Sequence, residues 1–207
     1  VKSIAAGEGG MITTNNYDIY KTLLRLRSHG INKLDDAFIN KELSKTKETS
    51  NPWYYEMQEL GFNYRITDIQ CALGKSQLNK LDTFINKRKY LVDRYDKAFS
   101  NLNFINPIQK EFRAVSSHHI YVVRINFEKI KKSRAEVMNL LKNAGIITQV
   151  HYIPVTSQPY YANLKYITEE YKNSLEYYKE CLTLPLYFSL TDEDQDYVIN
   201  QLKGVLE

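Results

Sequence analysis

The chain has 207 residues, 43% of them hydrophobic, and a formal net charge of +4 from 28 basic and 24 acidic residues. This size allows one sizeable hydrophobic core or two small ones, and no run approaches the roughly 18 to 20 apolar residues that a membrane span needs. Because the basic residues are interleaved with acidic ones, nucleic-acid binding is not indicated, while two cysteines outside any disulfide or zinc-ligand pattern favour a reducing, cytoplasmic location.

The first part of the chain is predicted to alternate short elements with a long polar connection. The turn Gly7-Glu8-Gly9-Gly10 directs the chain into a short β-favouring strand at 11–14. Asp18 is the expected cap of a helix that stops near Gly30, a residue suited to the left-handed terminating position. The stretch 32–63 is rich in Lys, Asp, Thr and Ser, and a connection of this length is usually functional or mobile.

A long helix is predicted over 67–102, because Thr67 and Gln70 form a T-x-x-Q capping box and apolar residues then recur at helical spacing. At a rise of 1.5 Å per residue such a helix would span on the order of 50 Å, so it connects two domains or bends, and we favour a bend near Asp82. The basic cluster Lys87-Arg88-Lys89 lies in this helix and is interpreted as a solvated face.

The remainder is predicted to form an α+β unit, because segments of period two alternate with capped helices. Ser133 and Glu136 form a capping box that begins one helix, and Gly145 ends it. The other expected elements are a strand at 120–126, a strand at 147–152, a loop at 154–159, a helix at 168–182 and a closing helix capped by Thr191.

Lys2 is the first residue to which chemistry can be assigned. A lysine amine attacks an aldehyde only when it is uncharged, so a lysine held in a shielded or cationic site can form a Schiff base with pyridoxal 5'-phosphate (PLP). The same amine is then placed to move the proton between the substrate carbon and the cofactor. Most lysines are solvated surface residues, however, so this role depends on context.

Asn63 and Arg65 lie on irregular backbone between the polar stretch and the capped helix, where binding residues are often found. An asparagine amide can donate to a phosphate and an arginine can pair with one. The structural alternative has equal weight: Asn63 closes a turn, and Arg65 pairs with a carboxylate.

Gln149, Val150, His151 and Tyr152 are predicted to form a strand whose alternation places Gln149 and His151 on one polar face. That face either meets solvent or forms the wall of a binding cleft together with a tyrosine-rich loop after Pro154. The other histidine pair, His118 and His119, is not expected to share a metal ion, because neighbours in a strand point in opposite directions.

Four ordered motifs together resemble the DegT/DnrJ/EryC1/StrS nucleotide-sugar aminotransferases over essentially the whole chain. They are Lys2 with its Gly-Glu-Gly-Gly turn, Arg27-Ser28-His29-Gly30, Gly61-Phe62-Asn63-Tyr64-Arg65 running into Asp68–Gly74, and His151-Tyr152-Ile153-Pro154. The resemblance implies that Lys2 is the Schiff-base lysine and argues for transamination, since related sugar dehydratases carry histidine there. It also implies that Asn63 reaches a neighbouring subunit's cofactor or substrate, and that Gln149, Val150, His151 and Tyr152 contact substrate.

The resemblance implies the α/β architecture of fold-type I PLP-dependent aminotransferases, working as a homodimer with shared active sites. We expect residues 1–66 to be the C-terminal remnant of the large PLP-binding domain, 67–102 a long connecting helix and 103–207 the small α/β domain. The cofactor's pyridine-nitrogen aspartate and its stacking aromatic residue are expected before Val1, so a chain that starts at the lysine would by itself be inactive.

The substrate implied by the resemblance is a UDP-linked 4-keto-6-deoxy amino sugar, with L-glutamate as amino donor. Within the family, the segments Gln149–Pro154, Gln158–Tyr161, Leu184–Tyr187 and Thr191–Gln195 look most like the enzymes of pseudaminic acid biosynthesis. Two alternatives stay open: an aminotransferase acting on another nucleotide keto sugar, and a non-catalytic dimerisation or nucleotide-sugar-binding module.

Overall fold

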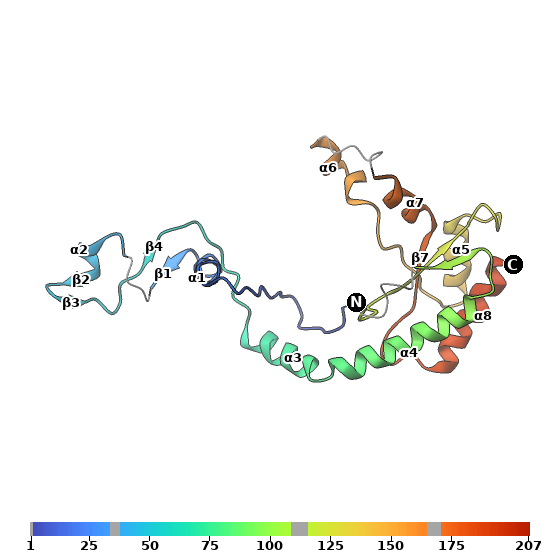
Figure 1. The fold of residues 1–207 in the computed structure, drawn as a ribbon, viewed down its shortest axis with the longest axis horizontal. Coiled ribbons are helices and arrows are strands. Elements are labelled where there is room, and N and C mark those ends of the chain that lie inside the picture. The colour runs from blue at the N-terminus through green and yellow to red at the C-terminus, as the bar shows by residue number, and fades with distance from the viewer. Residues whose placement is uncertain (1, 34–37, 109–115, 165–170) are drawn as a thin grey trace. The chain divides into compact units, whose positions relative to one another are not determined.

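The computed structural model describes residues 2–33, 38–108, 116–164 and 171–207 (Figure 1). They form two compact units, which we call the N-terminal unit (Ala5–Gln77) and the C-terminal unit (Val1–Ile4 with Leu78–Glu207). Helices and strands both contribute to the fold, as expected for an α/β protein. Within the described ranges, no helix combines the length and the apolar character that crossing a bilayer requires.

Helix α1 (Tyr17–Leu26) confirms the first predicted helix, but its cap is Asn16 and not Asp18. The Asn16 side chain accepts from the amides of Asp18 and Ile19 at 2.9 and 3.1 Å, and so satisfies two donors that a helix start leaves free. The strand predicted at 11–14 is wrong. Met11 is 86% exposed, and the segment pairs with no strand in the described part of the chain, so β propensity alone does not suffice.

The stretch expected to be a polar loop at 32–63 contains regular structure. Strand β1 (Ile31–Asn32) pairs antiparallel with β4 (Glu56–Met57), and β2 (Lys45–Thr46) pairs with β3 (Thr49–Ser50) after helix α2 (Lys41–Ser44). Short polar segments are hard to assign from the sequence because they have little apolar periodicity.

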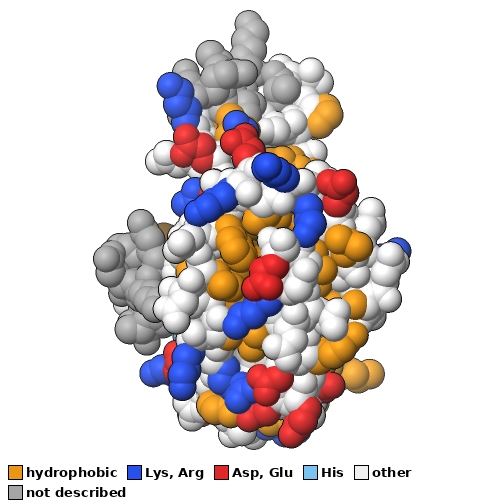
Figure 2. Space-filling view, turned by 90° about the vertical axis from the view of Figure 1, so that its right-hand side faces the viewer, with side chains coloured by type: hydrophobic (Ala, Val, Ile, Leu, Met, Phe, Trp, Pro, Cys, Tyr) orange, Lys and Arg blue, Asp and Glu red, His pale blue; other side chains and the backbone are white. Residues whose placement is uncertain are grey.

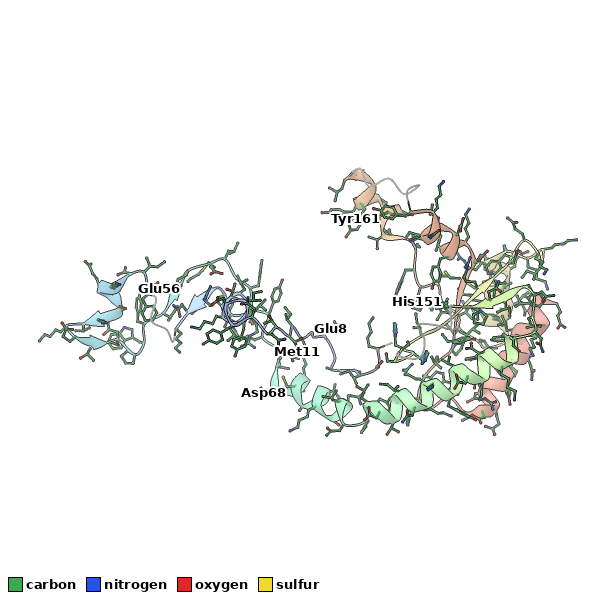
Figure 3. All side chains as sticks on the ribbon, viewed as in Figure 1. Glu8, Met11, Glu56, Asp68, His151 and Tyr161 are labelled. Atoms are coloured by element: carbon green, nitrogen blue, oxygen red, sulfur yellow. The ribbon has the colours of Figure 1, made fainter. Side chains whose placement is uncertain are left out.

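Glu56 connects this region (labelled in Figure 3). Its carboxylate accepts from the amides of Ile39 and Asn40, from the Tyr54 hydroxyl and from the Gln58 side chain, at 2.8 to 2.9 Å. Desolvation opposes ionisation of Glu56, but the hydrogen bonds outweigh it and lower its pKa from 4.5 to about 2. The Glu56 carboxylate therefore connects the start of the segment 38–58, at Ile39 and Asn40, to its end, at Tyr54 and Gln58.

Two helices replace the single long one, and the predicted break near Asp82 is confirmed: two residues separate the end of α3 (Asp68–Leu78) from the start of α4 (Leu81–Phe99). The capping box at the start of α3 is also confirmed. The Gln70 amide donates to the Thr67 hydroxyl at 3.3 Å, and the Thr67 amide donates back to the Gln70 side chain at 3.1 Å.

The C-terminal unit is built on a three-stranded antiparallel sheet in the order β5 (Ile105–Pro107), β6 (Tyr121–Ile125), β7 (Cys181–Leu184). Helices α4 and α8 (Asp192–Leu206) run side by side (Figure 1) and are joined by Arg94, which donates to Gln195 and Asp196 at 2.9 and 2.6 Å. One core unites the sheet with α4, α5 (Arg134–Asn143) and α8; its fully buried members include Tyr95, Phe99, Tyr121, Val123, Ile125, Val137, Leu141, Leu182 and Leu202.

Several local predictions in this unit are confirmed. The strand expected at 120–126 is β6, and Ser133 and Glu136 form both halves of the capping box of α5. Gly145 takes the left-handed conformation after α5, with φ of 79°, and the Thr191 side chain caps α8. The caps and the glycine terminator depend on neighbours within a few residues, whereas β6 also needs its partners β5 and β7.

Two predictions in this unit are wrong. Only Gln149 in the expected strand at 147–152 pairs, through a single bridge to Thr183, because the chain turns away towards Pro154.

The helix expected at 168–182 is α7 (Lys172–Glu180), and residues 168–170 lie outside the described part of the chain. Cys181 instead starts β7, whose four residues are all buried, and a short apolar run does not distinguish a buried strand from a helix end. The loop expected at 154–159 contains the 3₁₀ turn Val155–Ser157 and leads into α6 (Pro159–Asn163).

Basic and acidic side chains are interspersed on the face drawn in Figure 2, with hydrophobic side chains between them. This mixture matches the interleaved charges of the sequence.

The ionisation of Glu56 predicts an acid-sensitive N-terminal unit. Because its folded-state pKa of about 2 lies below the ordinary value of 4.5, its contribution is present above pH 4.5 and is lost as the pH falls towards 2. We expect the amide resonances of Ile39 and Asn40 to keep their positions from pH 7 to about 4.5 and to move as the pH approaches the folded-state pKa of about 2. Glu56→Gln should remove this titration; an unchanged titration in that variant would contradict the assignment.

Candidate active site

Lys2 lies on irregular, exposed backbone in the C-terminal unit. The next residue, Ser3, donates its hydroxyl to Ser117 at 3.0 Å and ties the lysine segment to the chain before β6. The pKa of His119 is lowered, first by burial and then by the positive charges of Lys2, Arg88 and His151. Lys2 and Arg88 therefore both disfavour the protonated form of His119.

Arg88 is a buried cation that the sequence interpretation missed. It is 8% exposed, and its Nη1 atom donates to the carbonyl oxygens of His118, His119 and Leu186 at 3.4, 3.1 and 3.1 Å. Burial lowers its pKa. The interpretation of 87–89 as a solvated face is wrong at this position, and the missed signal was its spacing, since Arg88 lies in the apolar stripe of α4 with Leu91 and Tyr95.

The segment 149–152 is fixed to β7 by backbone and side-chain contacts. Gln149 and Thr183 exchange backbone hydrogen bonds of 3.2 and 2.8 Å. His151 Nδ1 lies 2.9 Å from Thr183 Oγ1, and the Tyr177 hydroxyl donates to the His151 carbonyl at 3.1 Å. Figure 3 shows His151 close to the strands of this unit.

The side chains of this segment differ in exposure. Gln149 and Tyr152 are exposed, whereas Val150 and His151 are half-buried, and the rings of His151 and Tyr152 meet edge to face with their centroids 4.6 Å apart. An open depression of about 390 Å³ lies beside Tyr152, lined by Tyr152, Ile153, Pro154, Val155, Asn173, Ser174 and Tyr177. Tyrosine rings with amide and hydroxyl groups suit a ligand with both ring faces and polar substituents.

In the N-terminal unit, Asn63 and Arg65 are held against the turn after α1. Asn63 pairs with Ser28 in an isolated antiparallel bridge, and its side chain accepts from the Arg65 amide at 3.3 Å, as the turn-closing alternative expects. Arg65 Nη1 donates to the Ser28 hydroxyl at 3.0 Å rather than to a carboxylate. Both side chains are exposed, so both can also contact a ligand.

Two glycines, Gly30 and Gly61, allow the backbones of the segments 27–30 and 61–65 to lie close together. A Cβ atom on Gly61 would lie 2.2 Å from the Gly30 amide nitrogen, and one on Gly30 would lie 1.8 Å from the Glu59 carbonyl oxygen. Gly30 also has φ of 70°. The segments 27–30 and 61–65, which carry two of the motifs, therefore cross each other with their backbones in close contact. We call this contact the backbone crossing.

The residues of the C-terminal unit fit PLP in charge and access. Lys2 offers an exposed primary amine, and positive charge on Arg88, which has no carboxylate partner in the described part of the chain, attracts a phosphate-bearing aldehyde.

The described structure, a mixed α/β fold with an exposed lysine tied to the chain before β6, agrees with the comparisons with known proteins. The model of the DegT/DnrJ/EryC1/StrS aminotransferase family matches residues 1–203. The chain belongs to this family, and its fold is that of the fold-type I PLP enzymes.

Three individual relatives are similar to the chain over most or all of its length. The chain is 34% identical to the spore coat polysaccharide biosynthesis protein SpsC of Bacillus subtilis, over 100% of this chain and 51% of that protein. It is 33% identical to the UDP-4-amino-4,6-dideoxy-N-acetyl-beta-L-altrosamine transaminase of Campylobacter jejuni, over 100% and 50%. The sugar aminotransferase Spr1654 of Streptococcus pneumoniae, in its PMP form, matches with a TM-score of 0.76 and 30% identity, over 93% of this chain and 46% of that one. The chain thus spans about half the length of these relatives.

The backbone crossing predicts different effects for two glycine substitutions. Gly61→Ala places a methyl group against the Gly30 amide, and such overpacking should lower the free energy of unfolding by about 1–3 kcal/mol. Gly10→Ala is the control, because a Cβ atom there meets nothing within 4 Å. Denaturant unfolding measures both; equal stabilities for the two variants would show that the crossing tolerates a side chain.

Proposed function

We propose that the whole protein is a PLP-dependent aminotransferase that moves an amino group from L-glutamate to the C4 ketone of a UDP-linked 4-keto-6-deoxy amino sugar. The observation that carries the proposal is Lys2, an exposed residue whose segment is tied to the chain before β6 by the Ser3–Ser117 hydrogen bond, in a chain of the aminotransferase family. The 33% identity to the Campylobacter jejuni transaminase supports the choice of sugar. We place the enzyme in the cytoplasm.

Each predicted site residue has a role in this proposal. PLP, when bound to Lys2, supplies the electron sink for carbanion chemistry. The Lys2 amine, once released by the substrate amine, holds and moves the proton at the substrate carbon. Contacts to the sugar nucleotide come from the segment 149–152: Gln149, His151 and Tyr152 offer polar groups and an aromatic face, and Val150 offers an apolar contact.

Asn63 and Arg65 act across a dimer interface in this proposal. Both are exposed at the backbone crossing of the N-terminal unit, and both offer donors for phosphate oxygens. We propose a homodimer in which Asn63 reaches the cofactor or substrate of the neighbouring subunit and Arg65 contacts the substrate.

A different nucleotide keto sugar is the second candidate. Its support is the 34% identity to SpsC, a spore coat polysaccharide biosynthesis protein. Product analysis with UDP- and dTDP-linked 4-keto sugars separates the two candidates. If none of these sugars is aminated, the alternative of a non-catalytic nucleotide-sugar-binding module gains.

Removing the Lys2 amine tests the reaction directly. Borohydride reduction of the whole protein loaded with PLP should leave a stable adduct on Lys2, found by peptide mass spectrometry. Lys2→Ala should lower kcat by about 10²–10⁴-fold or more, since the general acid–base group is lost. Lys89→Ala, at an exposed position of α4, is the control; an adduct elsewhere, or full activity of Lys2→Ala, would contradict the role.

The shared active site is tested by mixing two inactive variants. Lys2→Ala and Asn63→Ala should each be nearly inactive as homodimers. In a mixed dimer, one of the two sites receives Lys2 from one subunit and Asn63 from the other, so activity should return at that site. Steady-state assays of co-expressed, separately tagged subunits measure it. Activity that stays absent in the mixed dimer would place Asn63 in its own subunit's site.

A further inference from the structure

The hydroxyl of Thr183 is a buried polar group beside the candidate substrate segment. Thr183 lies on β7 and is 6% exposed. Its backbone exchanges two hydrogen bonds with Gln149, while its Oγ1 atom lies 2.9 Å from His151 Nδ1. One residue therefore fixes the backbone of the segment and also the imidazole ring at its centre.

This contact selects one orientation of the ring. Rotation of the imidazole about its bond to Cβ would exchange the ring edges, and the contact to Thr183 favours the orientation with Nδ1 towards β7. The Tyr177 hydroxyl holds the His151 carbonyl, so the backbone cannot follow a rotated ring. The opposite nitrogen, Nε2, has no hydrogen-bond partner among the residues that the structure describes.

We propose that Thr183 is a positioning residue: its hydroxyl holds the His151 imidazole so that Nε2 is presented to the sugar nucleotide. The identity of that ligand rests on the proposed function. A hydroxyl can donate or accept, so the contact persists whichever ring nitrogen carries the proton. A carboxylate at this place would favour the charged imidazolium. Thr183 thus fixes the geometry of the ring without fixing its charge.

The chain provides a matched control at Thr148. This threonine is also 6% exposed, and it directly precedes Gln149. Its Oγ1 atom is buried without a hydrogen-bond partner in the described part of the chain. Replacing threonine by valine exchanges a hydroxyl for a methyl group of similar shape, so the same substitution removes a contact to His151 at one site and none at the other.

The kinetic test uses the whole protein with PLP and a UDP-linked 4-keto-6-deoxy-N-acetylhexosamine. Thr183→Val should raise KM for this sugar by about three- to tenfold, the effect of one lost hydrogen bond, with little change in kcat. Thr183→Ser should restore KM, and Thr148→Val should leave it unchanged. In a His151→Ala background, Thr183→Val should have no further effect, because the two residues act as one unit; an additive effect would overturn the proposal.

A second readout is independent of activity. In protein labelled with ¹⁵N-histidine, His151 is assigned by its loss in His151→Gln, and its Nδ1 resonance should move in Thr183→Val but not in Thr148→Val. Unmoved resonances would overturn the positioning role. If the unaltered enzyme aminates no keto sugar, the proposed function fails while the spectra still decide the role of Thr183. If Thr183→Val does not fold, Thr183→Ala serves as the hydroxyl-free variant.

Discussion

The buried guanidinium of Arg88 is the interaction on which the C-terminal unit's candidate site depends. It joins the backbone before β6, at His118 and His119, to the backbone after β7, at Leu186. Both segments lie outside helices and strands, so their carbonyl oxygens have no hydrogen-bond donor from regular secondary structure. Arg88 supplies that donor. The two chain segments that leave the sheet near the site are thus held by one side chain of α4.

A buried cation is costly unless its surroundings stabilise it. Arg88 is surrounded by carbonyl dipoles rather than by a carboxylate in the described part of the chain, so its positive charge is not cancelled locally. Burial lowers the pKa of His119 most, and the charges of Lys2 and Arg88 lower it further. The arrangement that fixes the backbone therefore also adds positive charge to the C-terminal unit, which suits a phosphate-bearing cofactor.

The sequence predicted those features whose chemistry is local. The capping boxes of α3 and α5 and the left-handed Gly145 involve neighbours within a few residues, and all were predicted correctly. The first two residues of β7, Cys181 and Leu182, were assigned to the end of a helix because the four buried residues of this strand show no period of two. The strand predicted at 147–152 failed because only Gln149 finds a partner. Pairing of this kind depends on distant chain segments and cannot be deduced from a short window.

In the candidate site, too, local features were predicted from the sequence and tertiary contacts were not. Its candidate residues were proposed from sequence motifs, but the residues that hold them were not, since Arg88 was taken for a surface cation and Thr183 was given no role. These supporting residues act through tertiary contacts: Arg88 binds carbonyl groups of His118, His119 and Leu186, and Thr183 contacts His151 thirty-two residues away. Sequence motifs therefore suggest candidate ligand-binding groups, whereas the fold reveals what orients them.

The N-terminal unit is stabilised differently from the C-terminal one. Helices α1 and α3 have no buried residue, and apolar side chains such as Tyr17, Ile19 and Ile69 are half or more exposed. This unit therefore relies on local hydrogen bonds, at Glu56 and at the crossing of Gly30 and Gly61, where the C-terminal unit relies on a hydrophobic core. Because most helical stability comes from packing an apolar face, we expect these faces to be covered in the whole protein. The hydrogen-bonded crossing would then fix Asn63 and Arg65 while packing on the other faces stabilises the helices.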